Sequence, residues 1–406
     1  MSNHESPAPT QPVPTHRTGG TSSPAPAPPG EHERSGFLSD EDVAARVLQH
    51  IRDRTTDLGG EVWREPVENY RSRERCAREI DTVLRRWPVP FCPGAALPDV
   101  GSYVAREAAG IPLVAVRGED GRVRAFRNAC RHRGTSLAEG SGCVRNFVCP
   151  YHGWTYRLDG RLRHVPHEHG FPGLDPSALG LVPVDCEERL GLVFVAQEPG
   201  AAGAASALDG LPTFVGAEQR LLGSGQNEIA VNWKIFLEGF LEGYHIRSTH
   251  PKSFYPYGFD NLTLVEACGA NSRVTFPFRR IQALADVAPA ARRVDGLLTY
   301  VYHLFPNALV TVLSRHTNLV VLEPLAVDRT RLVTWRLTNR GADAGDEAAA
   351  RRDAEFVNQT GASEDLAITL SIQRSLGSGA NEFYTFGHFE SALTHFHRTL
   401  DALLAS

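Results

Sequence analysis

The sequence lacks any apolar run long enough to span a membrane. Its longest apolar runs, such as "GLVFVA" near Leu192, are far shorter than the ~20 residues that a transmembrane helix needs. It also lacks an excess of positive charge, because the formal net charge of its 406 residues is -5. We therefore expect no membrane partner and no nucleic-acid partner, since binding to anionic lipid or nucleic acid would require a basic face.

Several familiar motifs are missing as well. No G-x-G-x-x-G follows an expected strand, and the plant-type C-x₄-C-x₂-C spacing is absent, so no nicotinamide, flavin or ferredoxin module is expected. The first residues do not combine a basic start with an apolar run, so no secretory signal is expected. The seven cysteines are an odd number, which favours a reducing compartment with free or metal-binding thiols rather than disulfides. Together these features predict a cytoplasmic protein.

Composition and periodicity divide the chain into four segments. Residues 1–36 are rich in Pro, Ser, Thr and Gly and can bury little, which predicts a disordered tail. Residues 37–85 show helical spacing, as in "LSDEDVAARVLQHIRDR". Residues 86–205 contain short strands separated by turns, which predicts a small all-β domain. Residues 206–406 combine strands with helical stretches, which predicts an α+β domain.

Cysteine and histidine occur together in two short stretches of the expected β domain. Cys130 and His132 form a C-x-H pair, and Cys149 and His152 form a C-x-x-H pair. Structural zinc sites usually pair cysteine with cysteine and histidine with histidine. One Cys and one His from each stretch suit a [2Fe–2S] cluster instead, in which one iron takes both thiolates and the other takes both imidazoles. Cys143 lies between the pairs and fits neither.

A second group of candidate ligands lies in "NWKIFLEGFLEGYHIRSTHP", residues 232–251. The spacing predicts one helix over residues 232–246, on which Glu238, Glu242 and His245 would share a face. A solvated helix face explains the glutamates without any chemistry, but it does not explain His250, which follows five residues after His245. Two neutral imidazoles and one carboxylate can occupy one face of an Fe(II) octahedron and leave the other positions open.

Three stretches resemble the ring-hydroxylating oxygenases that contain a Rieske centre. "CRHRG" followed by "CPYHGWTY" resembles their cluster signature, while "NWK…EGYHIRSTHP" and "SEDLAITLSIQ" resemble their later segments. The resemblance implies an α+β fold, with a Rieske [2Fe-2S] domain and a C-terminal helix-grip domain of antiparallel sheet and helices. It also implies a set of cluster ligands, which are Cys130, His132, Cys149 and His152.

The resemblance also implies a mononuclear Fe(II) site. Its ligands would be His245, His250 and a distant carboxylate, for which we choose Asp365, with Glu364 as the alternative. An acidic residue near a helix N-terminus is also favoured by the helix dipole, without any metal.

Glu242 resembles a bridging carboxylate that is most often Asp in the family. There it links a cluster histidine, here His152, to an iron-ligand histidine of the neighbouring subunit in a head-to-tail trimer. The glutamate resembles the branch that includes quaternary-ammonium monooxygenases. Gly239 departs from the family pattern, because many members have Asn at that position.

The implied function is that of a terminal oxygenase. It would use O₂ and electrons from a separate reductase or ferredoxin to hydroxylate, by mono- or dioxygenation, a small organic substrate that is aromatic or natural-product-like. The alternative is an N- or O-demethylating monooxygenase acting on a quaternary amine or a methoxy compound. A homotrimer is expected, with or without a small β subunit. Two other classes stay open: a Rieske electron carrier without catalysis, and a zinc-stabilised binding module.

Overall fold

A computed structural model of the chain describes residues 36–339 and 344–405. The predicted disordered tail, residues 1–36, lies almost entirely outside these residues. Helix α1 (Asp40–Asp53) begins after Ser39, whose side-chain oxygen accepts a hydrogen bond from the Asp42 N–H. This confirms the helix predicted there. No helix in the described part of the chain is both long and apolar enough to cross a membrane.

The remainder of the segment predicted to be helical contains both helix and strand. Helix α2 (Arg73–Arg78) continues into a π-helical turn, Glu79–Leu84. Strand β1 (Trp63–Pro66) was not expected, and it pairs with β19 (Phe383–Phe386) from near the other end of the chain. This pairing ties the two ends of the described chain together.

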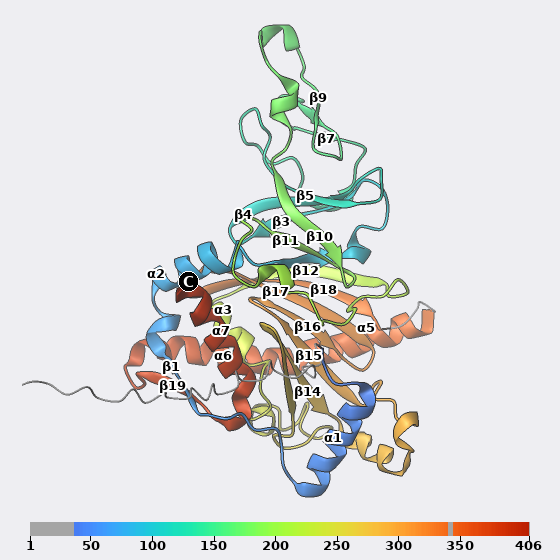
Figure 1. Cartoon of the computed structure of the whole chain (residues 1–406), viewed down its shortest axis with the longest axis vertical. Helices are drawn as coiled ribbons and strands as arrows, with labels where there is room; N and C mark the ends of the chain where they lie inside the picture. Colours follow the sequence, from blue (N-terminus) through green and yellow to red (C-terminus); the bar gives the residue numbers. More distant parts are fainter. Residues whose placement is uncertain (1–35, 340–343, 406) are drawn as a thin grey trace, which may run out of the picture. The chain divides into compact units, whose positions relative to one another are not determined.

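The first large sheet is antiparallel and has seven strands. Their order is β2 (Val89–Pro93), β11 (Leu192–Ala196), β10 (Pro183–Arg189), β5 (Val123–Arg127), β4 (Ile111–Arg117), β3 (Ser102–Ala108) and β6 (Gly140–Cys143). A small sheet of β7 (Phe147–Val148), β8 (Thr155–Tyr156) and β9 (Leu162–His164) extends from it (Figure 1). Both cysteine–histidine stretches lie in connections between these strands.

The second large sheet is also antiparallel and has seven strands. Their order is β12 (Leu221–Ile229), β18 (Arg329–Thr338), β17 (His316–Ala326), β16 (Ala308–Val312), β15 (Leu298–Leu304), β14 (Asn271–Pro277) and β13 (Leu264–Cys268). The helices of this part are α3 (Trp233–Glu238), α4 (Ile246–Thr249), α5 (Ala344–Gln359), α6 (Gly361–Ser375) and α7 (Ser391–Ala405). The predicted α+β fold, a small β domain followed by antiparallel sheet with helices, is confirmed.

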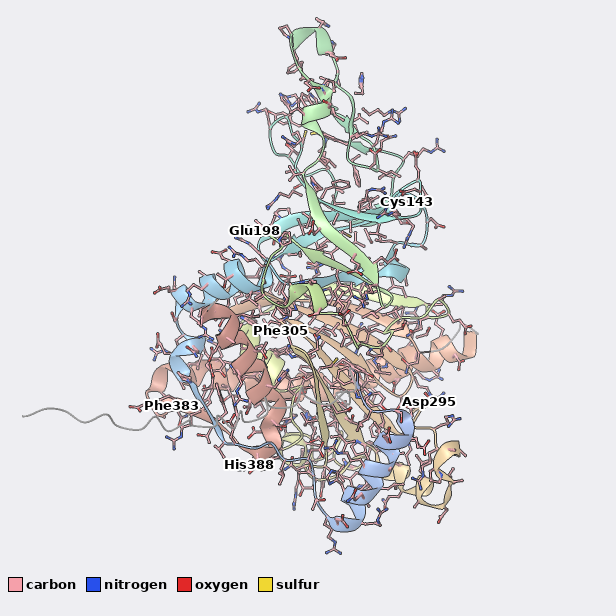
Figure 2. All side chains as sticks on the ribbon, in the orientation of Figure 1. Cys143, Glu198, Asp295, Phe305, Phe383 and His388 are labelled. Carbon is pink, nitrogen blue, oxygen red and sulfur yellow. The ribbon has the colours of Figure 1, made fainter. Side chains whose placement is uncertain are left out.

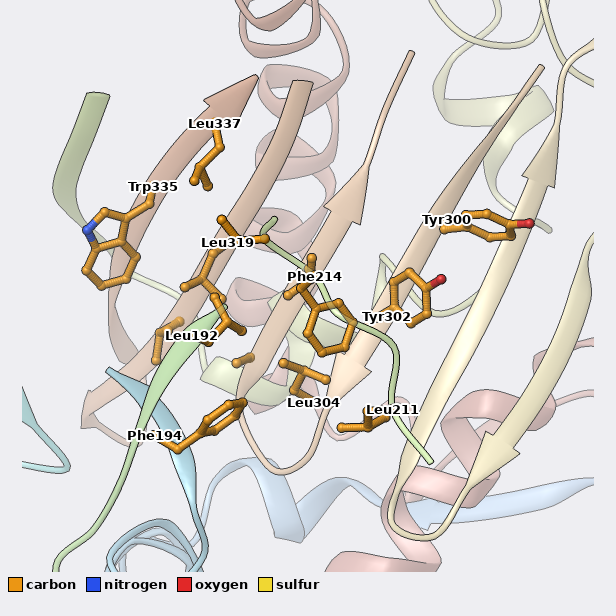
Figure 3. Close-up of a cluster of buried hydrophobic side chains, with 14 of the residues drawn as sticks. Leu192, Phe194, Leu211, Phe214, Tyr300, Tyr302, Leu304, Leu319, Trp335 and Leu337 are labelled. Carbon is orange, nitrogen blue, oxygen red and sulfur yellow. The ribbon is translucent and has the colours of Figure 1, made fainter. Parts of the chain in front are cut away.

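The two faces of the second sheet have different roles. Successive side chains of a strand point to opposite faces, so Trp335 and Leu337 of β18 point to one face and Arg336 to the other. Figure 3 shows Trp335 and Leu337 in an apolar cluster with Leu192 and Phe194 of β11. Burial of apolar surface at roughly 25 cal/mol per Å² therefore holds the first sheet against this face. The opposite face is free to line a cavity.

A buried ion pair also joins the two sheets. Arg106 of β3 donates to a carboxylate oxygen of Glu323 of β17 at 2.6 Å, and both side chains are almost completely buried. The Arg106 guanidinium also donates to the carbonyls of Pro90, Phe91 and Glu107. Because the partners of both charges are in place, removing either one leaves an uncompensated buried charge, at a cost of about 3–5 kcal/mol.

Candidate metal centres and their pocket

The two cysteine–histidine stretches form turns of the same design. The Gly134 N–H donates to the carbonyl of Cys130, and the Gly153 N–H donates to the carbonyl of Cys149. Both glycines have positive φ, 82° and 73°, which glycine adopts without the steric cost of a side chain. Each turn therefore bends back on its own cysteine, and this bend explains the glycine after each pair.

The four candidate ligands of these turns meet in space. The Nδ1 atoms of His132 and His152 lie 3.1 Å apart, and the Trp154 ring stacks on His132 with centroids 4.9 Å apart. Cys130 and Cys149 are buried in one apolar cluster, and the Tyr156 hydroxyl lies 3.3 Å from the Cys130 sulfur. The turns thus combine two buried thiols with two imidazoles nearer the surface.

The spacing of these ligand atoms tests which metal group fits. Around a tetrahedral zinc ion all ligand atoms would lie roughly 3.5 Å from one another. Among the described residues, only His245, His250 and Asp365 bring three such atoms within 4.8 Å of one another. The four residues of the turns are too widely spread for one ion. They fit a two-iron cluster, which puts its own atoms between the thiols and the imidazoles.

The cysteine that lies between the two pairs in the sequence is apart from the turns in the structure. Cys143 ends the exposed strand β6 (Figure 2), and its thiol lies 3.5 Å from the Val100 carbonyl. All seven cysteines are free thiols in the structure.

The single helix predicted over residues 232–246 is wrong. Helix α3 ends at Glu238, and α4 begins only at Ile246. Gly239 and Gly243 lie in the break, where a glycine costs a helix about 1 kcal/mol relative to alanine. Glu238 and Glu242 therefore do not share a face. The Glu238 carboxylate accepts from the Tyr70 hydroxyl, whereas Glu242 interacts with His245.

The break brings the two histidines and a distant carboxylate together. Asp365 of α6 places its Oδ1 atom 2.8 Å from His250 Nε2 and 3.7 Å from His245 Nε2. The His250 Nε2 atom is buried without an aligned hydrogen bond from any described residue. Three donor atoms of the types that Fe(II) accepts thus converge on one point, so the donor set fits a 2-His-1-carboxylate iron site.

Two further carboxylates contact the Nδ1 atoms of these histidines, on the side away from Asp365. Glu242 accepts a hydrogen bond from His245 Nδ1 and from the backbone N–H groups of Tyr244 and His245. Glu364 lies 2.7 Å from His250 Nδ1. Glu364, the alternative ligand, therefore contacts Nδ1 of His250, whereas Asp365 contacts Nε2. Its position fits an orienting group rather than a ligand.

The surrounding negative charge affects both imidazoles. Burial lowers the pKa of His245, but the hydrogen bond and charge of Glu242, together with the charges of Asp365 and Glu390, outweigh burial, so the pKa is raised overall. For His250 burial is likewise outweighed, by Asp365 and then Glu364. The hydrogen bond with His250 in turn lowers the pKa of Glu364. An environment that favours a proton on these imidazoles also favours a metal cation in its place.

A buried network below the break was missed by sequence reasoning. His397 of α7 is fully buried, with its Nε2 atom 2.9 Å from Glu238 and its Nδ1 atom 3.3 Å from Glu65. Tyr70 donates to the same Glu238 carboxylate. The network joins α3, α7 and β1, but only the fold brings these residues together.

A cavity of about 920 Å³ opens beside the His245, His250 and Asp365 triad. Its floor is the free face of the second sheet, and its walls come from the break, α5 and α6. Its lining is largely apolar and rich in aromatic rings, among them Phe236, Phe240, Phe254, Tyr257, Phe276 and Phe278. Such a volume is typical of a small-molecule site, so the triad lies where a substrate would be enclosed.

Comparison with known proteins identifies the domains. The family model of the Rieske [2Fe-2S] domain matches residues 88–178, and that of the ring-hydroxylating alpha subunit catalytic domain matches residues 217–406. The matched domains define an iron-dependent oxidoreductase. The chain belongs to the Rieske non-heme iron oxygenases, and the matched domains imply a [2Fe-2S] cluster and a mononuclear iron.

Individual relatives are named as oxygenase subunits of monooxygenases. The carnitine monooxygenase oxygenase subunit of Escherichia coli K12 is 28% identical over 302 residues, which are 68% of this chain and 79% of the relative. The glycine betaine monooxygenase oxygenase subunit of Chromohalobacter salexigens is 35% identical over 291 residues, 61% of this chain and 65% of the relative. A crystal structure of a quaternary ammonium Rieske monooxygenase superposes with a TM-score of 0.72 at 20% identity, covering 91% of this chain and 99% of that one.

Proposed function

We propose that this terminal oxygenase acts on a quaternary amine, by monooxygenation of a carbon attached to the nitrogen. The named relatives act on such compounds, and this supports the alternative substrate class better than the aromatic or natural-product-like one expected first. The cavity adds a physical reason, because aromatic faces attract a trimethylammonium group that cannot accept a hydrogen bond. The aromatic lining beside the triad is the observation that favours this function most.

Each metal group is assigned to its own residues. Cys130, Cys149, His132 and His152 would hold the cluster, and His245, His250 and Asp365 would hold the iron. When bound, the two groups supply electron transfer and dioxygen activation. One oxygen atom would enter a C–H bond and the other would leave as water, which consumes two electrons from a separate ferredoxin or reductase and two protons from the solvent.

The protein groups around the iron site would orient the two histidines and neutralise part of the charge of the iron. Asp365 contributes a negative charge, and Glu242 and Glu364 keep the Nδ1 sides of His245 and His250 occupied, so that both Nε2 atoms face the same point. The apolar cavity would limit the access of water to that point.

The route between the two sites would pass through a second copy of the chain. The described contacts of the Glu242 carboxylate are to Tyr244 and His245, and none is to His152 of the same chain. His152 and Tyr244 are exposed, which leaves them accessible to a neighbouring subunit. We therefore propose a cytoplasmic homotrimer in which Glu242 joins His245 to His152 of the next copy.

The substrate proposal is tested by oxygen uptake with a surrogate reductase across a substrate panel. The panel contains quaternary amines, methoxy compounds and aromatic hydrocarbons. We expect uptake to be coupled to the consumption of a quaternary amine. Uptake coupled only to the oxidation of an aromatic ring would contradict the proposal.

Glu242→Gln tests the proposed path separately. We expect an unchanged cluster absorption spectrum and a loss of turnover of at least about 10-fold, because the bridging and orienting carboxylate is neutralised. Unchanged turnover would mean that electrons do not pass through Glu242.

A further inference from the structure

The floor of the cavity contains a short polar row within an otherwise apolar lining. Arg336 of β18 lies opposite Asn318 of β17, and Asn318 lies opposite Thr311 of β16. Directly opposed residues of an antiparallel pair have Cβ atoms about 5 Å apart. All three side chains line the cavity. A guanidinium, an amide and a hydroxyl group thus lie side by side across three strands.

Two groups of this row lack hydrogen-bond partners within the described part of the protein. Among the described contacts, the partly buried Arg336 side chain makes no hydrogen bond and no ion pair. The Asn318 Oδ1 atom is buried without a partner. A half-turn of the amide would present its NH₂ group at the same place. Buried polar groups normally have partners, so the row is the place where a ligand would supply them.

The other charged groups along the cavity are either exposed or already paired. Arg280 donates to the Ser314 hydroxyl, and Arg279 lies over the Tyr255 ring with its guanidinium carbon 5.6 Å from the ring centroid. The Asp353 carboxylate lies 2.8 Å from the Nδ1 atom of His316. Among the described lining residues, Arg336 is therefore the only arginine that is partly buried, because Arg279 and Arg280 are exposed, and its positive charge selects an anion.

We propose that Arg336 and Asn318 form a carboxylate subsite, so that the substrate is a quaternary amine with a carboxylate at its other end. This deepens the proposed function and rests on it. The guanidinium fork can donate two parallel hydrogen bonds to a planar carboxylate, and the amide NH₂ adds a donor beside it. The aromatic lining would receive the ammonium end. The cavity, at about 920 Å³, has room for a spacer between the two groups.

The test is equilibrium binding to the anaerobic holoenzyme, measured by calorimetry with three probes. These are γ-butyrobetaine, its methyl ester, and its tert-butyl isostere, in which carbon replaces the quaternary nitrogen. The ester removes the negative charge alone, and the isostere removes the positive charge alone. We expect γ-butyrobetaine to bind roughly 10- to 100-fold more tightly than its ester, as expected for a charge-assisted hydrogen bond.

Two variants test whether the affinity difference between γ-butyrobetaine and its ester depends on Arg336. Arg336→Gln should weaken binding of γ-butyrobetaine and of the isostere by roughly 10- to 100-fold and leave the ester unchanged. Arg329→Gln, on the exposed start of the same strand, is the matched control and should change none of the three. Cluster absorption and the unfolding temperature verify that both variants fold.

The outcomes separate the two proposals. If the ester binds as tightly as the acid and Arg336→Gln alters neither, the subsite is wrong while the quaternary-amine proposal stands. If only the isostere binds, and does so through Arg336, the carboxylate subsite stands and the quaternary-amine proposal is wrong. If none of the probes binds the wild-type protein, the subsite is overturned.

Discussion

The two proposed metal centres of this chain are built in opposite ways. The cluster site is formed within 23 residues, from Cys130 to His152, by two turns of similar design. The iron site joins His245 and His250 to Asp365, more than a hundred residues further along the chain. The first has an exposed histidine, whereas the second lies beside an enclosed cavity.

This difference matches the different demands on the two sites. A group that receives electrons from another protein must lie near the surface, and local turns are sufficient to place its ligands there. A group that reacts beside a substrate needs a cavity, and only the packing of distant elements encloses one. A change in a turn should therefore affect the cluster alone, whereas a change around α6 should affect the iron alone.

Cys130→Ser is expected to have the largest effect. Loss of one thiolate should remove the cluster absorption and electron-spin signal, and turnover with them, because a cluster iron loses a ligand. Cys143→Ser is the control, since this thiol lies on β6 outside the turns. Loss of the cluster in Cys143→Ser as well would contradict the assignment.

Asp365→Ala should have the complementary effect. The mononuclear iron should be lost and turnover should fall below measurement, while the cluster spectrum stays intact. Iron content per chain, measured beside visible absorption, separates the two losses. Full iron and activity in this variant would exclude Asp365 as a ligand.

Glu364→Ala should weaken the iron site without abolishing it. The side chain contacts His250 from behind, and the loss of such a partner typically costs about 10- to 100-fold in metal affinity. Glu364→Gln keeps a hydrogen-bond acceptor and should recover most of that affinity. Iron affinity is measured by competition with a chelator. An effect as large as that of Asp365→Ala would mean that Glu364 is itself the ligand.

The smallest expected effect is a pH dependence of stability. Burial lowers the pKa of His397, but Glu238 and Glu65 outweigh burial and raise it from 6.5 to about 9. Because the folded pKa is the higher one, this stabilisation is fully present below pH 6.5 and is lost as the pH rises through about 9. The unfolding temperature should fall over this window.

His397→Gln should lower the unfolding temperature at pH 6 and flatten its decline towards pH 9.5. An equally steep decline in the variant would assign the pH dependence to other groups. The cluster absorption at low temperature should not change in this variant, because His397 contacts Glu65 and Glu238 and not the cysteine–histidine turns.

Sequence reasoning reached furthest where the candidate ligands are close neighbours along the chain. The two cysteine–histidine pairs can be recognised directly in the sequence, because each pair lies in one short turn that is closed by its own backbone hydrogen bond. Helical periodicity led to an error at residues 232–246, because the position of Glu238 suits a continuous helix as well as the shorter helix that the structure has. Its spacing from Glu242 suits a helix face, yet the fold directs it to Tyr70 and His397.

The sequence by itself determined the character of the two domains and indicated the proposed cluster pairs and iron histidines, since these depend on local residue types and spacing. Only the tertiary structure distinguishes Asp365 from Glu364, because these adjacent residues at the start of α6 face opposite nitrogens of His250. It also revealed the unsatisfied Arg336 and Asn318. Their proximity depends on strand register across the sheet, which no local pattern of residues specifies.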